Sequence, residues 1–311
     1  MHATSSRRIM ATPAQILAEL SASAREALLE RSDRAGLTHL AVHLGIIVAL
    51  MGYVAAGLPL WWAAMLPLGV AFVFLFTLQH ECTHKTPFKT GILNDIVGHL
   101  CALLIVQPFL WFRAFHMAHH RHTNDPEKDP ELQGDAKPEN WAEFAWHLSC
   151  IGYWGGKLQT LSSNALGRFD DSYVAERAQR RLRVEARVLI AVYVAVLVFT
   201  LTVSPILIWI WAVPLLLGFP VLRLYLLAEH GRCPTVANMF ENTRTTLTNP
   251  LVKLIAWNMP YHSEHHAYPN VPFYKLPDAH KVTAPHLQNI SDGYVEFTKT
   301  YVAPLNENHD I

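Results

Sequence analysis

Residues 38–79 read THLAVHLGIIVALMGYVAAGLPLWWAAMLPLGVAFVFLFTLQ and contain no Asp, Glu, Lys or Arg. A second stretch without these residues covers 188–222. Each stretch is much longer than the roughly 20 apolar residues that one membrane-crossing helix needs. Each also contains a proline-bearing break, near Gly57–Pro59 in the first and near Ser204–Pro205 or Ala212–Pro214 in the second. They therefore predict two helical hairpins, over 37–57 with 60–80 and over 187–208 with 212–231.

The composition agrees with a membrane location. Hydrophobic residues make up 51% of the chain and charged residues 16%, and only the last predicted span carries internal charges, Arg223 and Glu229. A soluble protein would not build four helices so nearly free of charge. The sequence thus predicts an all-α polytopic membrane protein. Its formal net charge of zero gives no indication of nucleic-acid binding, and the four isolated cysteines favour reduced or buried thiols over a disulfide framework.

Arginines flank the predicted hairpins on one side. The excess of arginine before the first and third spans places both termini and the middle segment in the cytoplasm. The residues concerned are Arg7, Arg8, Arg25, Arg31, Arg34, Arg177, Arg180, Arg181, Arg183 and Arg187. The amino-terminal stretch lacks the apolar core of a signal peptide.

Polar and amphipathic segments surround the spans. Thr12–Gln15 has the pattern of a helix capping box, and Leu17, Leu20, Ala24 and Leu28 follow at helical spacing. We expect an amphipathic helix there, either on the membrane surface or packed on a cytosolic cap. Residues 123–135 form an acidic loop and 139–173 run along the interface. We divide the chain into an amino-terminal segment (1–36), one membrane domain (37–290) and a carboxy-terminal tail (291–311).

Three tight histidine clusters, here called boxes, stand out against this background: HECTH at 80–84, HMAHH at 116–120 and HSEHH at 262–266. Helix positions three and four residues apart share one face, so each box directs two or three imidazoles to a common point. Convergent imidazoles suit Zn, Cu, Fe or Ni. Eight clustered histidines exceed the needs of one tetrahedral ion, so the pattern indicates two metals.

The boxes also constrain residues 91–112, which are apolar and nearly long enough to cross a bilayer. A true span would place the first two boxes on opposite faces of the membrane. We therefore expect an interfacial or re-entrant helix, with Pro108 near its end.

Other functions fit parts of this pattern. Residues 80–84 match H-E-x-x-H, in which two histidines bind zinc and the glutamate is the general base of a metalloprotease. That function leaves two boxes unused. A metal or haem carrier would place its ligands deep inside the spans, whereas the histidines of these spans lie near their ends. Histidines that only form hydrogen bonds would explain any single box.

The pattern of the three boxes resembles that of the membrane fatty acid desaturase and hydroxylase superfamily. The flanking text FHMAHHRHTNDPEKDPEL (115–132) and NMPYHSEHHAYPNVPFYKLP (258–277) is similar to its acyl desaturase branch, and the likeness covers about residues 40–290. It implies a histidine-rich di-iron centre above a four-span bundle with a cytosolic cap. It also implies one more ligand at the end of the fourth span, which His230 supplies. The expected metal ligands are His80, His84, His116, His119, His120, His230, His262, His265 and His266.

Removal of hydrogen from an unactivated methylene needs an oxidant made from O2 at iron, which acid–base chemistry cannot supply. We expect two iron ions, O2 as co-substrate and a fatty acyl substrate that is desaturated. Hydroxylation or ketolation of an acyl, carotenoid or other apolar substrate is the alternative. The chain has no His-Pro-Gly-Gly motif and no cysteine quartet, so electrons would come from a separate ferredoxin, rubredoxin or cytochrome b5. The Ala- and Leu-rich composition hints at a bacterial cytoplasmic membrane.

Several other side chains are candidates for supporting roles. Polar groups in or beside the boxes would orient the imidazoles: Glu81, Glu229, Asn258 and Glu264, with Asp95 further away. His99 and His122 are weaker ligand candidates. Aromatic residues would line a substrate tunnel or anchor the chain at the interface: Trp111, Phe112, Phe115, Trp146 and Trp154.

Overall fold

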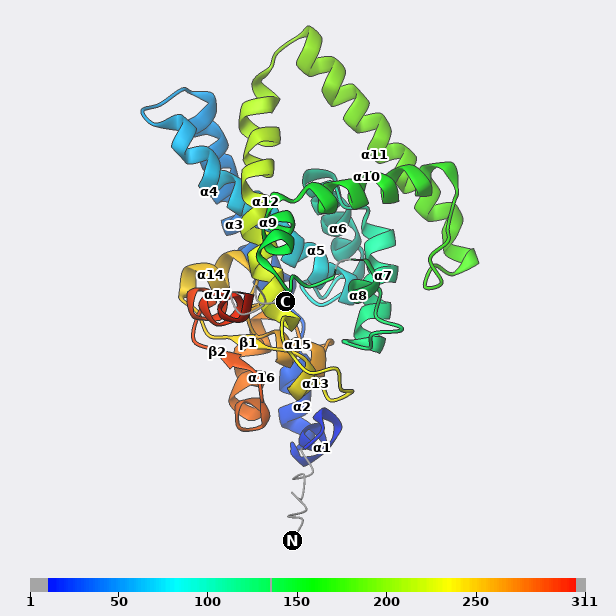
Figure 1. Ribbon diagram of the computed structural model, residues 1–311, viewed down its shortest axis with the longest axis vertical. Helices are drawn as coiled ribbons and strands as arrows, with labels where there is room; N and C mark the ends of the chain where they lie inside the picture. Colours follow the sequence, from blue (N-terminus) through cyan, green and yellow to red (C-terminus); the bar gives the residue numbers. More distant parts are fainter. Residues whose placement is uncertain (1–10, 135, 306–311) are drawn as a thin grey trace.

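The computed structural model describes residues 11–134 and 136–305 (Figure 1). Arg7, Arg8, Asp135 and the ends of the two predicted terminal segments lie outside these residues. The elements up to residue 166 are α1 (Pro13–Glu19), α2 (Ala22–Leu29), α3 (Asp33–Ala55), α4 (Trp61–Val73), α5 (Leu75–His84), α6 (Gly91–Ile105), α7 (Phe109–His122), α8 (Pro130–Gly134), α9 (Trp141–Ser149) and α10 (Ile151–Leu166). Those that follow are α11 (Glu176–Thr202), η1 (Ile208–Ala212), α12 (Val213–His230), α13 (Met239–Asn242), β1 (Thr245–Thr246), α14 (Pro250–Ile255), α15 (His262–Ala267), η2 (Phe273–Lys275), α16 (Leu276–Thr283), η3 (Ala284–His286), β2 (Ile290–Ser291) and α17 (Tyr294–Val302).

Four helical stretches are long and apolar enough to cross a membrane, as predicted. They are Ala22–Ala55, Trp61–His84, Glu176–Thr202 and Ile208–His230. Apolar side chains on them face outward: Val48 is 65% exposed, Leu197 55% and Leu201 76%. Exposed apolar surface of this extent is suited to contact with lipid rather than with water.

The bounds of the second hairpin differ from those predicted. The third span begins at Glu176 rather than 187, because its arginine-rich start continues as regular helix, and it ends at Thr202. The chain therefore turns near Ser204–Pro205. The other predicted break, at Ala212–Pro214, does not end the helix. A π-helical turn, η1, precedes Pro214, which lies in the first turn of α12, where its missing N–H is tolerated.

Helices α4 and α12 approach each other closely at a pair of glycines. A Cβ atom built on Gly69 would lie 1.9 Å from the carbonyl oxygen of Pro214, and one built on Gly218 would lie 2.3 Å from the carbonyl oxygen of Gly69. Only hydrogen at both positions allows this approach. The crossing fixes α12, and with it His230, relative to the helix that continues into the first box.

Helices α6 and α7 form a bent pair with an angle of 102° between them. The chain turns at Val106, which has a left-handed backbone with φ 56°, and α7 restarts after Pro108. Glu185 of α11 stabilises this turn, since its carboxylate accepts hydrogen bonds from the backbone N–H groups of Phe109 at 2.9 Å and Leu110 at 3.0 Å. The structure divides the predicted interfacial or re-entrant helix over 91–112 between two helices, and a pair bent in this way forms either a broken span or a re-entrant segment.

The cap lies at the opposite end of the molecule from the tips of the spans (Figure 1). It contains α13–α17 and a two-stranded parallel sheet in which Thr245 pairs with Ile290. The predicted capping box is present at Thr12, but the expected single amphipathic helix is two helices, α1 and α2, because the chain leaves helical geometry at Leu20. Ile16 and Leu28 are buried in the apolar core of the cap, so the alternative of a segment packed on the cap is the one observed. All four cysteines lie among the described residues, and none forms a disulfide.

Candidate metal centre

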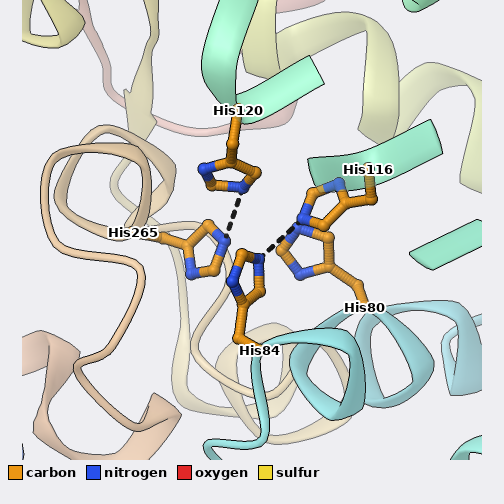
Figure 2. A group of neighbouring side chains, drawn as sticks. All are labelled: His80, His84, His116, His120 and His265. Carbon is orange, nitrogen blue, oxygen red and sulfur yellow. Dashed lines mark hydrogen bonds between the residues drawn. The ribbon is translucent and has the colours of Figure 1, made fainter. Parts of the chain in front are cut away.

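The first two boxes and part of the third meet beneath the cap. Five imidazoles lie with one nitrogen of each within 4.8 Å of the others (Figure 2). They come from α5 (His80 and His84), α7 (His116 and His120) and α15 (His265). We call these five residues the first group.

The nitrogen separations in the first group suit a shared metal ion. Nε2 of His84 lies 2.8 Å from Nε2 of His116, and Nε2 of His120 lies 3.2 Å from Nε2 of His265. When two imidazole nitrogens each lie about 2.1 Å from one metal ion, and the angle between the two bonds is about 90°, the nitrogens are about 3.0 Å apart. Both ring nitrogens of the buried His80 have no hydrogen-bond partner. A buried polar atom left in this way is costly unless another ligand, such as a metal, satisfies it.

A second group consists of His119 of α7, His230 of α12 and His266 of α15. Nε2 of His119 lies 3.2 Å from Nε2 of His230, and Nε2 of His266 is buried without a hydrogen-bond partner. His262 adjoins this group, with its Nε2 3.1 Å from that of His230. The structure therefore brings eight of the nine predicted ligands into two groups that could each hold a metal ion, with the ninth, His262, beside the second group.

The outer nitrogens of the second group are held by the protein. Nδ1 of His119 lies 2.9 Å from Oδ1 of Asp129, Nδ1 of His230 lies 3.2 Å from the carbonyl oxygen of Asn242, and Nδ1 of His266 lies 3.2 Å from the hydroxyl of Thr123. If each Nδ1–H donates to its oxygen, Nε2 keeps its lone pair for a metal. Such partners fix the tautomer and the orientation of the ring.

Burial keeps the histidines of the third box neutral. It lowers the pKa of His262, His265 and His266 well below the ordinary value, and the neighbouring imidazoles add to the effect. Neutral imidazole is the form that binds metals, so these three side chains are ready to act as ligands at neutral pH.

Glu81 faces away from the space between the first five histidines. Its fully buried carboxylate accepts hydrogen bonds from the Thr86 hydroxyl at 2.8 Å and from the Phe273 N–H at 3.2 Å. Its Oε1 lies 3.3 Å from Nδ1 of His265. A protease base must face a metal-bound water, whereas the oxygens of this carboxylate lie against Thr86, Phe273 and the Nδ1 side of His265. The arrangement argues against the metalloprotease alternative.

Of the other candidates for orienting residues, only Glu229 has a side-chain contact with a predicted metal ligand, His262. Its Oε1 is 3.4 Å from Nδ1 of His262. Asn258 donates instead to the carbonyl oxygen of Phe273, and Asp95 forms an ion pair with Lys85. Glu264 accepts hydrogen bonds from Thr245 and His280, both at 2.5 Å, and so ties α15 to β1 and α16 within the cap.

The weaker ligand candidates lie outside both groups. His99 pairs with Glu185 at 2.8 Å on the far side of α6. His122 ends α7 without joining either group.

Sequence reasoning missed Asp129, which it assigned to a plain acidic loop. This carboxylate is buried, contacts His119 and also accepts hydrogen bonds from the backbone N–H groups of Asn124 and Glu131. One signal in the sequence could have identified Asp129: the acidic run lies directly after the second box.

A cavity of about 1020 Å³ opens onto both groups, since His80, His116, His119 and His262 form part of its wall. Four of the five predicted aromatic residues, Trp111, Phe112, Phe115 and Trp146, also line it. Trp154 does not, because it packs against Phe219 in the apolar core, with ring centroids 4.8 Å apart. The cavity can hold an apolar chain beside the histidines.

This chain is similar both to a family model and to individual known proteins. Residues 56–298 match the family model described as Fatty acid desaturase. The chain is similar to dihydrorhizobitoxine desaturase of Bradyrhizobium elkanii, with 29% identity over 71% of this chain and 68% of that protein. It is also similar to sn-1 oleoyl-lipid 12-desaturase of Anabaena variabilis, with 28% identity over 34% of this chain and 37% of that protein. A third similar protein is sn-1 acyl-lipid omega-3 desaturase (ferredoxin) of Nostoc sp. (strain 36), with 33% identity over 28% of this chain and 24% of that protein.

Proposed function

This chain belongs to the fatty acid desaturase family, and we propose that it is an O2-dependent di-iron membrane enzyme that introduces a double bond into an acyl chain. The observation that carries the proposal is the convergence of nine imidazoles, eight in two groups and His262 beside the second, of which four line one cavity. Nine ligands are too many for one ion, and imidazole suits iron.

Two iron ions held by these residues would supply the O2-derived oxidant that breaks an unactivated C–H bond. The first group would hold one ion, and the second group with His262 would hold the other. Asp129, Thr123 and the Asn242 carbonyl would keep three of the imidazoles in orientation. The cavity would position one C–C segment of the substrate against His80 and His116, and its aromatic wall would exclude water.

The enzyme would also need an electron donor and a fixed orientation in the membrane. Electrons would come from a separate ferredoxin, rubredoxin or cytochrome b5 docking near the cap; the name of the Nostoc relative records ferredoxin. The arginines before α3 and within α11 support cytoplasmic termini, in the inner membrane of a bacterium. Labelling of single cysteines at Ser23 and Leu58 in intact cells would test this orientation, because only the second should react with an impermeant reagent from outside.

The deciding experiment is elemental analysis of detergent-purified protein from iron-replete cells, followed by lipid profiling. About two iron atoms per chain and new double bonds in cellular acyl groups are expected. New hydroxyl or keto groups in place of double bonds would favour the alternative oxidation. One zinc per chain without iron would contradict the proposal. Two zinc atoms would require iron reconstitution before the activity is measured.

A further inference from the structure

A groove of about 600 Å³ lies on the outer surface, where α11 passes beside α6 and α7 (Figure 1). One wall is α11, and the other is formed by His99 and Leu103 of α6 and Leu110 of α7. The groove shares no lining residue with the cavity that opens onto the histidine groups. Its volume is within the roughly 300–1,000 Å³ of small-molecule sites. It therefore has room for a ligand other than the substrate.

The part of the groove along α11 is largely apolar. Its residues on this helix include positions 181, 184, 185, 188, 189 and 192, which have the spacing of one helix face. Val184 and Val188 are each 55% exposed, in a helix long and apolar enough to cross a membrane. From Arg181 to Val192 the helix rises about 16 Å, close to the roughly 15 Å of hydrocarbon in one leaflet. This face suits an acyl chain that lies along α11 within the bilayer.

Two arginines stand at one end of the groove. Arg180 and Arg181 line it just before the apolar part of α11, and both are exposed. Within residues 11–134 and 136–305, neither forms an ion pair with a carboxylate, that of Glu176 one turn earlier included. Guanidinium groups present paired N–H donors that match a phosphate. Basic residues beside a membrane helix attract anionic lipid headgroups.

The carboxylate in the groove, that of Glu185, is engaged on the opposite wall. Its Oε1 lies 2.8 Å from Nδ1 of His99, and its two oxygens also accept hydrogen bonds from the backbone N–H groups of Phe109 and Leu110. These partners belong to α6 and α7, so they hold the carboxylate away from the arginines. The arginine end of the groove keeps a positive charge that a phosphate can neutralise.

From this arrangement we infer that one anionic phospholipid binds in the groove, with its phosphate on Arg180 and Arg181 and an acyl chain along Val184, Val188 and Val192. The inference does not depend on the reaction. The lipid is a partner of the protein rather than its substrate, because none of the nine clustered histidines lines the groove. A zwitterionic lipid would bring its own cation close to the arginines and bind less tightly.

Native mass spectrometry of the iron-loaded, detergent-purified protein tests this with dioleoyl phosphatidylglycerol and dioleoyl phosphatidylcholine, which differ only in the headgroup. One phosphatidylglycerol per chain should bind about 10-fold more tightly than phosphatidylcholine, because each arginine near an anionic headgroup contributes about 5-fold. Arg180→Gln/Arg181→Gln should remove most of this preference. Arg168→Gln/Arg187→Gln is the matched control. It removes the same charge from exposed arginines outside the groove and should retain the preference.

Val188→Trp tests the apolar part of the groove, because the larger side chain would fill the groove while both arginines remain. It should weaken the binding of both lipids, and it serves as the test if the double arginine variant does not accumulate. Its position is exposed, so the fold has room for the indole.

Equal binding of the two lipids would overturn the inference, and so would a full preference in Arg180→Gln/Arg181→Gln or unchanged binding in Val188→Trp. An equal loss in the control pair would contradict it as well, since attraction would then come from the surface as a whole. Displacement of phosphatidylglycerol by equimolar inorganic phosphate would indicate an ion site instead. Iron content and double-bond formation are measured separately, so any of these results leaves the proposed function standing.

Discussion

The carboxylate of Asp129 lies 2.9 Å from Nδ1 of His119, on the side of the ring opposite the nitrogen that faces His230. Asp129→Asn should therefore lower iron affinity about 10- to 100-fold, because the amide orients the imidazole less firmly and no longer raises its basicity. Iron content after dialysis against a chelator measures this. Asp125→Asn, in the same loop, is the matched control and should keep its iron, because the Asp125 carboxylate pairs with the backbone N–H of Glu127 and with Lys128 rather than with a histidine.

Loss of one imidazole from either group should have a larger effect. His119→Ala and His265→Ala should each abolish activity and reduce bound iron while membrane insertion is unchanged, because neither side chain contributes to a span. His122→Ala is the control from the same helix as His119 and should retain activity. Full activity in His119→Ala or His265→Ala would remove that residue from the metal centre.

Glu81→Gln distinguishes an orienting carboxylate from a protease base. Because Oε1 of Glu81 lies 3.3 Å from Nδ1 of His265, its substitution should reduce iron affinity about 10- to 100-fold but leave measurable oxidation. Iron analysis and product formation, with iron in excess, are the measurements. Proteolysis by the wild-type protein that disappears in Glu81→Gln would contradict this assignment.

The glycine crossing of α4 and α12 should tolerate no side chain. Gly218→Ala should lower the free energy of unfolding by about 1–3 kcal/mol or prevent accumulation of folded protein, because its Cβ would meet backbone atoms of Gly69 and Val70. Gly45→Ala, in α3 with open space around it, is the control. Thermal unfolding in detergent compares the two, and equal midpoints would show that the helices can separate at little cost.

Local patterns in the sequence account for the spans and for the eight histidines of the three boxes. The stretches without charged residues predict the membrane helices. Helical spacing places His116, His119 and His120 on one face of a helix. The division of these three residues between two groups could not be predicted, because it depends on where α12 and α15 lie. Asp129 was missed because its contact with His119, ten residues away, depends on how the loop after α7 folds back, which no helical period encodes. His230 was predicted only from the family resemblance, and the glycine crossing explains how α12 holds it there.

The second group of histidines has a consequence for how the protein is assembled. Its members come from α7, α12 and α15, so the most distant of them are separated by most of the membrane domain. A nascent chain released before α15 would hold fragments of both groups and complete neither. Iron would then be the last component to enter, and bound iron would report that the cap has closed over the bundle.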